Sequence, residues 1–508
     1  MNRMNNNLFT KVILLTAVIV YTVTAINSKG YYHGDEHYQI IEFSGIKSGT
    51  HTANELAWEY NANIRSALMP SVCYGLFSIL NLLSVTDPYT QTAILRILTG
   101  LLCIFVIQLF IKSNDSIINI NNKTVFLILS FFLWFLPVLN VRFSSETLSG
   151  ITFLLAVSML QLEKLKSKRF SYFFIGAVLG ISFLCRFQSV ILSIGLIGWL
   201  VFINKTALNK LIQLLFGVTV IIVLGVLIDC WFYQKFVITF YNYFHVFSTT
   251  DDLSSSFGTL PWYYYILYLI KFPFFLIGIL ILLSFIILII KSPKSIIVWA
   301  VIPFIIIHSL IHHKEERFLF PIVNFLPVIL ILAYQQIESI ILNRKFHYIK
   351  LIILIPLVLL NIVGLFAMST KSAGVGRMDI TSYIHNQYKA DQVNLISCQW
   401  SSPYNPWQSL PTKYYQEKNV KEVQIKSLCT LSDSLIDNTR INLLVLRKAE
   451  LNNPECVEML AKMHCIKLRQ SIPEWMELAN NYYSGIDKDD ILVLYLIKGG
   501  ESFIINQL

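Results

Sequence analysis

Long apolar runs divide most of this chain into segments that are each able to cross a bilayer. A membrane span needs about 20 predominantly apolar residues, and shorter runs can cross where the bilayer thins or the run is joined by flanking residues. The runs lie at 11–28, 92–111, 124–141, 147–161, 171–186, 189–203, 208–229, 270–290, 295–311, 318–334 and 350–367. They predict an all-α polytopic membrane protein with about 11 transmembrane helices.

The charge distribution supports a membrane protein and argues against a nucleic-acid-binding protein. Charged residues make up 14% of the chain, against about 25% in typical soluble domains. The net charge is +10, but the basic residues occur in short groups between apolar runs, as expected of charges that fix membrane orientation. We therefore expect membrane lipids, and no nucleic acid, among the partners.

Four basic groups predict the orientation, because Lys and Arg concentrate in cytoplasmic loops. They lie at 164–169, 204–210, 291–294 and 343–350. Counting crossings from these groups places four segments on the outer side, namely 142–146, 230–262, 312–317 and everything after 368. The apolar stretch 66–85 would break this count if it crossed, so we expect it to lie on the outer face. The first outer loop then spans 29–91, a length that is typical of functional loops.

The composition changes after residue 367, where short apolar runs begin to alternate with polar segments. We expect residues 1–367 to form the transmembrane domain, with a functional outer loop at 29–91, and residues 368–508 to form an outer soluble α/β domain. An outer location would permit disulfides, whose connectivity the sequence does not reveal. The cysteines of this region are Cys398, Cys429, Cys456 and Cys465. No cysteine or histidine spacing predicts a metal site.

The first outer loop carries acids beside histidines. Such a group suits general acid/base chemistry, because a carboxylate near low-dielectric lipid can have a raised pKa and accept a proton from a hydroxyl. A solvated loop without catalytic function is the alternative, since charge clusters are common in loops. The group comprises His33, Asp35, Glu36, His37 and Glu42, followed by Glu55, Trp58, Glu59 and Arg65.

Three isolated arginines, Arg96, Arg142 and Arg186, each lie at the predicted outer end of a span. An unpaired cation in the hydrocarbon costs about 2 to 3 kcal/mol, so an anionic partner is expected. Together with Lys314 and Arg317, these arginines are able to line a phosphate site. The alternative is that they anchor the spans by extending their charged ends to the interface.

Four motifs resemble, in order and spacing, glycosyltransferase family 22, the Alg9-like family that includes GPI-anchor and lipid-linked-oligosaccharide mannosyltransferases. They read GDEHYQ (34–39), LAWEYNANIRSALMP (56–70), SSSFGTLPWYYY (254–265) and HHKEERFLFPI (312–322). The aromatic residues of the third motif also suit a turn at the membrane interface. Gly34 stands where the family typically has proline, so the local loop geometry is expected to differ.

The resemblance implies a GT-C membrane fold with an outer-face active site. It implies transfer of a hexose, usually mannose, from a polyprenyl or dolichyl phosphate to a hydroxyl of a lipid-linked glycan, with inversion. It assigns catalysis to Asp35, with Glu36 beside it. The donor phosphate would contact the basic residues His313, Lys314, Arg317, Arg142, Arg186 and Arg96. The acceptor or the sugar would contact His37, Trp58, Glu59, Trp262 and Glu315. Neither a metal nor another cofactor is expected, because cationic side chains can hold a phosphate leaving group.

Two alternatives share part of this pattern. A flippase or transporter of a lipid-linked saccharide would also need outer-face cations, but transporters typically show interrupted spans at the midplane and two related halves, which the sequence lacks. Another GT-C glycosyltransferase with a different sugar would share the acidic loop but not the HKEERF motif. The Ile-, Asn- and Lys-rich composition favours a bacterial inner membrane over an endoplasmic reticulum membrane.

Overall fold

The computed structural model describes residues 2–249, 258–341, 347–373, 376–398, 400–405, 410, 412–428, 431–483 and 491–498. It contains two compact units. The helical unit comprises residues 1–26, 58–77 and 94–370, and the sheet unit comprises residues 27–57, 78–93 and 371–508. Each unit is therefore assembled from segments that are separated along the chain.

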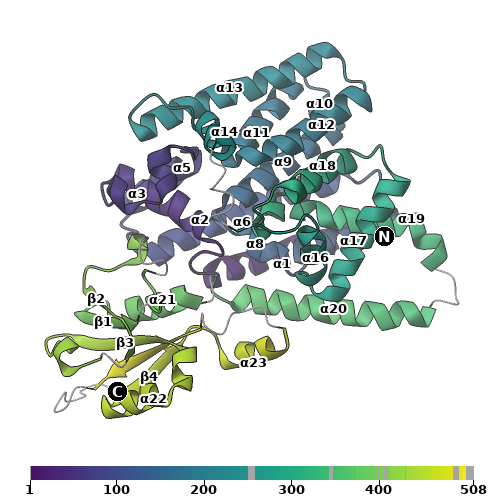
Figure 1. Cartoon of the computed structure of the whole chain (residues 1–508). Helices are drawn as coiled ribbons and strands as arrows, with labels where there is room; N and C mark the ends of the chain where they lie inside the picture. Colours follow the sequence, from purple (N-terminus) through teal and green to yellow (C-terminus); the bar gives the residue numbers. More distant parts are fainter. Residues whose placement is uncertain are drawn as a thin grey trace. The chain divides into compact units, whose positions relative to one another are not determined.

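Helices make up nearly all of the helical unit, and the long ones are mostly apolar (Figure 1). They are α1 (Asn2–Asn27), α4 (Trp58–Ala62), α5 (Leu68–Leu82), α6 (Pro88–Ser113), α7 (Lys123–Phe132), α8 (Leu136–Asn140), α9 (Ser145–Gln161), α10 (Glu163–Lys166), α11 (Ser171–Cys185), α12 (Val190–Phe202), α13 (Leu208–Tyr233), α14 (Thr239–Thr249), α16 (Tyr264–Lys271), α17 (Phe275–Lys291), α18 (Ile296–Leu310), α19 (Leu326–Ile341) and α20 (His347–Thr370). A 3₁₀ segment, η5 (Glu316–Phe325), precedes α19.

Five helical segments in the described residues are long and apolar enough to cross a membrane. They are Leu8–Asn27, Pro88–Ser113, Leu208–Tyr233, Glu316–Glu338 and Ile352–Thr370. Further apolar helices are shorter, and α5 is one of them. The helices indicate a multi-pass membrane protein, whereas the eleven crossings, the orientation and the position of 66–85 stay predictions.

Two of the predicted apolar runs form broken helices. The run 124–141 contains α7 and α8, which are separated at residues 133–135, and the run 270–290 contains α16 and α17. Phe274 lies at the second break with φ of 64°. A right-handed helix needs a negative φ at every residue, so the backbone cannot continue as one helix through Phe274. A positive φ is also rare for a residue of this size.

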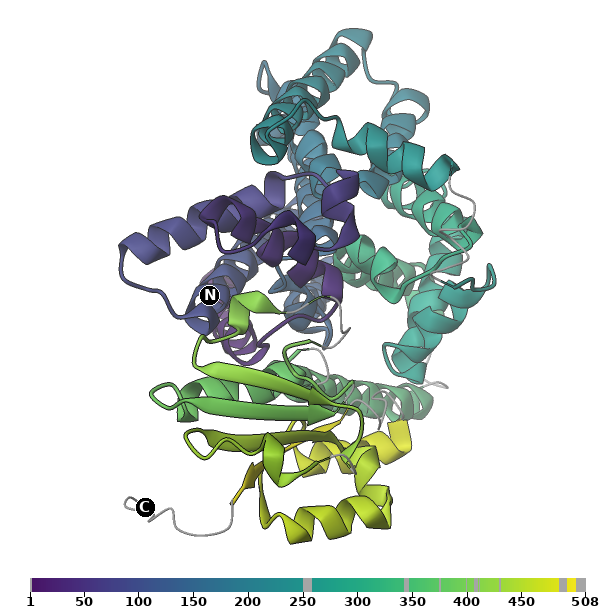
Figure 2. The same ribbon diagram turned by 60° about the vertical axis from the view of Figure 1, so that its left-hand side comes forward.

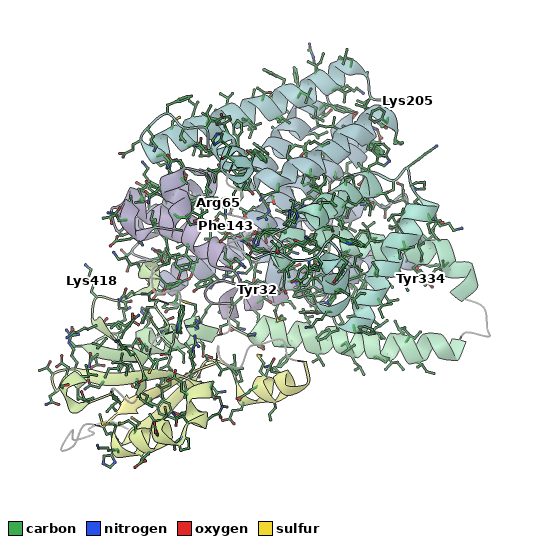
Figure 3. All side chains as sticks on the ribbon, viewed as in Figure 1. Tyr32, Arg65, Phe143, Lys205, Tyr334 and Lys418 are labelled. Carbon is green, nitrogen blue, oxygen red and sulfur yellow. The ribbon has the colours of Figure 1, made fainter. Side chains whose placement is uncertain are left out.

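Glycines allow α11 and α13 to pack backbone against backbone (Figure 1). A Cβ atom on Gly176 would lie 1.9 Å from the carbonyl oxygen of Leu214, and one on Gly217 would lie 2.1 Å from that of Phe173. Such close packing of small residues is a common way for membrane helices to associate. Lys205, in the turn that leads into α13, is exposed (Figure 3).

A five-stranded sheet forms the centre of the sheet unit (Figure 2). The strands are β1 (Val393–Cys398), β2 (Val420–Ile425), β3 (Ile441–Arg447), β4 (Cys465–Gln470) and β5 (Leu492–Ile497), in the order β2-β1-β3-β5-β4. β1 pairs in parallel with β2 and β3, whereas β5 pairs antiparallel with β3 and β4. The helices of this region are α21 (Arg377–Gln387), α22 (Pro454–Lys462) and α23 (Glu474–Tyr483).

Both faces of the central strands are covered, which explains why β1 and β3 are apolar almost throughout. Leu395 and Leu443 belong to a buried cluster that includes Ile384 of α21. The adjacent residues Ile396 and Leu444 point to the other face and belong to a cluster that includes Leu460 of α22. Strands buried on both faces are expected to be continuously apolar rather than alternating.

The first outer loop contributes most of its residues to the sheet unit. These residues form α2 (Gly34–Glu36), the π-helical turn η1 (His37–Ile41), α3 (Glu42–Ser48) and η2 (Ala53–Glu55). The sequence predicts a boundary at 367/368 with all of 29–91 in the first domain, whereas contacts group 27–57 and 78–93 with the tail. Cys429 lies outside the described residues, so the disulfides stay a prediction.

Candidate active site

Glu36 supports the backbone of the acidic loop. Its Oε1 accepts hydrogen bonds from the backbone N–H groups of Tyr32 and His33, and the latter bond is 3.2 Å long. The two residues His33 and Glu36 form a capping box around the short helix α2. Tyr32 is labelled in Figure 3. Because Glu36 is buried and bonded in this way, its carboxylate holds the turn that carries Asp35.

Asp35 is the more accessible acid of the pair. Its side chain is 25% exposed, and its carboxylate Oδ1 lies 4.0 Å from Nδ1 of His33. A base must reach the proton that it removes, so accessibility favours Asp35 over Glu36 for this role. The geometry therefore separates two adjacent carboxylates that look equivalent in the sequence.

Glu42 is the centre of a buried cluster in the sheet unit. Its Oε1 lies 2.6 Å from Nε2 of His37, and its Oε2 contacts Nε2 of His51. The backbone N–H of Tyr414 also donates to Oε1, at 3.2 Å. Burial opposes ionisation of this carboxyl, but the charges and hydrogen bonds of His37 and His51 outweigh burial and lower the pKa of Glu42 to about 2.

His37 packs inside the sheet unit, although the sequence predicts a contact with the acceptor or the sugar. The side chain is fully buried. Its ring stacks between those of Tyr31 and Tyr415, with centroid distances of 5.1 and 5.4 Å. With both faces covered and Nε2 bonded to Glu42, His37 supports the loop rather than offering a surface to a sugar.

The helical unit contains a second buried cluster, which we call the arginine cluster: Glu146, Arg186, Glu315 and Arg317. Glu146 lies in the first turn of α9, where Ser144 caps the helix by accepting from the N–H of Thr147. Its Oε1 accepts from Nη1 of Arg186 at 2.5 Å and from Nη1 of Arg317 at 3.4 Å. One buried carboxylate oxygen is thus shared by two guanidinium groups.

The HKEERF motif folds so that Glu315 and Arg317 pair with each other. Nε and Nη2 of Arg317 donate to the two carboxylate oxygens of Glu315, at 2.7 and 3.0 Å. Nε2 of His313 lies 3.0 Å from the same carboxylate. Gly150 of α9 permits this arrangement, because a Cβ there would lie 2.5 Å from the carbonyl oxygen of Pro321 in η5. The motif is thereby placed directly against α9.

The other predicted cations are buried but occupy different surroundings. The ammonium of Lys314 donates to the carbonyl oxygens of Leu260 and Ile311, at 2.8 and 2.5 Å. Nε of Arg96 donates to the carbonyl oxygen of Ala25 at 2.7 Å. Arg142 is 4% exposed and precedes the cap of α9. The structure thus brings Arg186, Lys314 and Arg317 to one region of the helical unit, whereas Arg96 is bonded near the end of α1.

The predicted sugar-binding residues also differ in accessibility. Trp58 and Trp262 are 40% and 64% exposed. Glu59 lies 3.7 Å from Arg65 in an ion pair. The motif that contains Trp262 is only partly covered, because residues 254–257 lie outside the described residues. Within the described residues, no group of three or more His, Cys, Asp or Glu side chains suits a metal ion.

Two buried residues of the helical unit were not identified from the sequence. In the sequence, Glu146 looks like an ordinary acid at a helix N-terminus. The feature that could have identified it was its position near Arg142, at the predicted outer end of a span. His308 of α18 is the single histidine of the run 295–311, which is an unusual place for an ionisable side chain. It is 1% exposed.

Comparisons with known proteins agree with the motifs. A model of the Alg9-like mannosyltransferase family matches residues 12–415. GPI mannosyltransferase 3 of Candida albicans is 26% identical over 395 residues, covering 77% of this chain and 73% of the relative. GPI alpha-1,2-mannosyltransferase 3 of Bos taurus is 23% identical over 303 residues, covering 57% of this chain and 53% of the relative.

A solved structure shows the fold class. ArnT from Cupriavidus metallidurans, bound to undecaprenyl phosphate, superposes with a TM-score of 0.54 at 12% identity, covering 96% of this chain and 98% of ArnT. At this identity the likeness concerns the fold alone. It confirms the expected GT-C class of helical membrane protein with a small sheet domain.

Proposed function

Because this chain belongs to the Alg9-like mannosyltransferase family, we propose that it transfers mannose from a polyprenyl or dolichyl phosphate to a hydroxyl of a lipid-linked glycan. The undecaprenyl phosphate bound to ArnT supports a polyprenyl-linked donor. The names of the relatives support a glycan of the GPI type as acceptor class. In this proposal the active site lies on the outer face of the membrane.

Asp35 acts as the general base in this proposal. The acceptor oxygen forms a bond to C1 of mannose while the bond from C1 to the phosphate oxygen breaks. The hydroxyl proton moves to Asp35, and the electron pair of the broken bond stays on the lipid phosphate. Attack from the face opposite the phosphate inverts the anomeric centre. The accessibility of Asp35 and the structural bonds of Glu36 support this division of roles.

The observation that carries the proposal is the pair of buried arginines that share Glu146. Glu146 and Glu315 balance the charges of the two guanidinium groups. Lys314 of the same motif adds a further positive charge. Positive groups fixed in advance stabilise the charge that develops on a departing phosphate. Arg186, Arg317 and Lys314 are therefore proposed as the donor-phosphate side, with His313 and Glu315 orienting Arg317.

The direct test incubates the purified protein in detergent with polyprenyl-phosphate mannose and a panel of lipid glycans, followed by mass spectrometry. We expect a mass increase of one hexose on one glycan class and release of polyprenyl phosphate. Transfer from a nucleotide-linked mannose alone would contradict the donor assignment. Recovery of an intact lipid-linked saccharide on the opposite leaflet of vesicles, without cleavage, would instead support a transporter.

The orientation is tested separately by labelling single cysteines in a cysteine-free background. We expect positions 50 and 90 to react from the same side of the membrane. Labelling from opposite sides would show that residues 66–85 cross, and it would contradict the predicted count of eleven spans.

A further inference from the structure

His308 has one ring nitrogen with an assigned partner and one without. Nδ1 lies 2.8 Å from the carbonyl oxygen of Phe304, one helical turn earlier in α18. Nε2 is buried and has no hydrogen-bond partner among the residues that the structure describes. Buried polar atoms are normally bonded, so such an atom at a candidate site needs an explanation.

The bond to Phe304 fixes the chemical character of Nε2. A carbonyl oxygen only accepts, so Nδ1 must carry the hydrogen. In the neutral ring Nε2 then presents a lone pair and acts as an acceptor. The buried atom is thus suited to a ligand that donates a hydrogen, such as a hydroxyl group.

Arg186 supplies unused donors in the same region. Its Nη1 bonds to Ser145 and Glu146, whereas Nε and Nη2 are buried without a partner in the described part of the chain. The side chain is 3% exposed. Two unused guanidinium N–H groups suit the oxygens of a phosphate.

Phe318 connects the two groups. The Cζ atom of Arg186 lies 5.0 Å from the centroid of its ring, and the ring of His308 lies 6.1 Å from it. Phe318 is only half-buried, in contrast to the two side chains against which it packs. Phe318 thus packs against both Arg186 and His308.

We propose that His308 binds the sugar of the donor, with Nε2 accepting a hydrogen bond from a sugar hydroxyl while Nε and Nη2 of Arg186 donate to the donor phosphate. The proposal rests on the donor class given above, and it adds a residue that distinguishes the sugar from the lipid phosphate. A phosphodiester offers no hydrogen to an acceptor, so the neutral imidazole has no use for the phosphate itself.

Two substitutions separate ligand binding from support of the helix. The amide nitrogen of Asn in His308→Asn can replace Nδ1 and keep the bond to Phe304, but nothing remains at Nε2. The longer side chain of His308→Gln reaches the position of Nε2 and loses the bond to Phe304. Leu310→Ala, at an exposed position of the same helix, serves as a control.

We expect His308→Asn to raise KM for polyprenyl-phosphate mannose about three- to tenfold, the usual effect of one hydrogen bond, and His308→Gln to restore most of it. Equal KM values in His308→Asn and wild type, or a greater loss in His308→Gln than in His308→Asn, would overturn the proposal. Because either variant risks misfolding, monodeoxy-mannose donors give a second test in any folded variant. Compared with the full mannose donor, one of the deoxy donors should bind wild type more weakly but bind the His308 variant equally well. If no deoxy donor shows this difference, the proposal is wrong.

Direct binding of two probes distinguishes this inference from the proposed function. Polyprenyl phosphate without sugar should bind His308→Asn as well as wild type, and it should bind Arg186→Gln more weakly. Equal weakening of both probes in His308→Asn would show a structural role and overturn the inference. If wild type neither binds nor consumes polyprenyl-phosphate mannose, the proposed function itself has failed. If wild type consumes it and residue 308 does not discriminate the sugar, only the inference has failed.

Discussion

Each unit of this protein contains a buried carboxylate that two basic side chains share, but the bases differ. Glu42 of the sheet unit lies between His37 and His51, whereas Glu146 of the helical unit lies between Arg186 and Arg317. Histidine can give up its proton when its counter-ion is lost. Arginine stays charged at any pH that a folded protein meets.

The difference explains how each cluster serves its unit. His37 stacks on Tyr415, and Glu42 accepts from the backbone of Tyr414, so the cluster joins the first loop to the segment that contains these tyrosines. The arginines around Glu146 keep their charge, and Arg186 keeps donors that are not used in the described structure. A histidine cluster is suited to holding a structure together, and an arginine cluster is suited to holding an anion.

The largest expected difference between the clusters is in stability. In Glu146→Gln the buried Arg186 loses its counter-charge and cannot become neutral, so we expect a loss of about 3 kcal/mol in unfolding free energy. Arg317 keeps its pair with Glu315. In Glu42→Gln the amide can keep a hydrogen bond to a neighbouring histidine, and the loss should be nearer 1 kcal/mol. Denaturant titration of both variants in detergent measures the two losses in unfolding free energy. Equal losses would remove the distinction between the clusters.

The two adjacent acids of the first outer loop, Asp35 and Glu36, are compared by the effect of their substitution on turnover. Asp35→Asn should lower turnover by about a hundredfold, because the amide cannot accept the hydroxyl proton. Glu36→Gln should lose much less, because its carbonyl oxygen can still accept from the N–H groups of Tyr32 and His33. Both kcat values are measured with polyprenyl-phosphate mannose on protein of matched expression. Near-normal turnover in Asp35→Asn would exclude Asp35 as the base.

Exchange of the cations sharpens the role of the arginine cluster. Arg317→Lys keeps the charge but loses the paired bonds to Glu315, so kcat/KM for the donor should fall about tenfold. Lys314→Arg should also impair donor use, because the larger group does not fit between the carbonyls of Leu260 and Ile311. Lys205→Arg, in an exposed turn (Figure 3), is the matched control. Wild-type donor kinetics in both motif variants would identify them as membrane anchors.

Acid should weaken the sheet unit through Glu42, the smallest of the expected effects. The pKa of Glu42 is lowered from 4.5 to about 2 in the folded protein. A lowered carboxyl pKa stabilises the fold above its ordinary value, and this contribution disappears as the pH falls from about 4.5 towards 2. The protection of residues 37–48 against hydrogen exchange, measured relative to the intrinsic exchange rate at each pH, should therefore fall across this range in wild type. In Glu42→Gln the fall in protection should be smaller, and an identical fall would show that other acids cause it.

The sequence predicted the helical segments well, because apolar runs long enough to span a bilayer have few alternatives. Every predicted run coincides with helix in the structure. The breaks in two of the runs were not predicted, although Pro273 directly before Phe274 is an ordinary sign of a helix break. The pattern of apolar residues does not show where the membrane boundaries lie, so it does not decide which helices cross. The eleven crossings therefore stay a prediction.

The candidate site was predictable in its residue types and less so in its connections. The motif that contains Lys314 and Arg317 was identified because charges beside apolar runs are costly. The partner Glu146 was missed because an acid in the first turn of a helix is an ordinary stabilising feature. The burial of His37 was not predictable, because its partners Glu42, Tyr31 and Tyr415 lie together only in the folded chain.

The three-part construction of the sheet unit has a consequence for biosynthesis. Glu42 accepts a hydrogen bond from the backbone of Tyr414, which follows it by 372 positions. The ribosome must therefore complete almost the whole membrane region before the loop that carries Asp35 can obtain its final contacts. Until the tail emerges, the loop lacks this contact, and a chain truncated before the tail would leave the carboxylate of Glu42 without it.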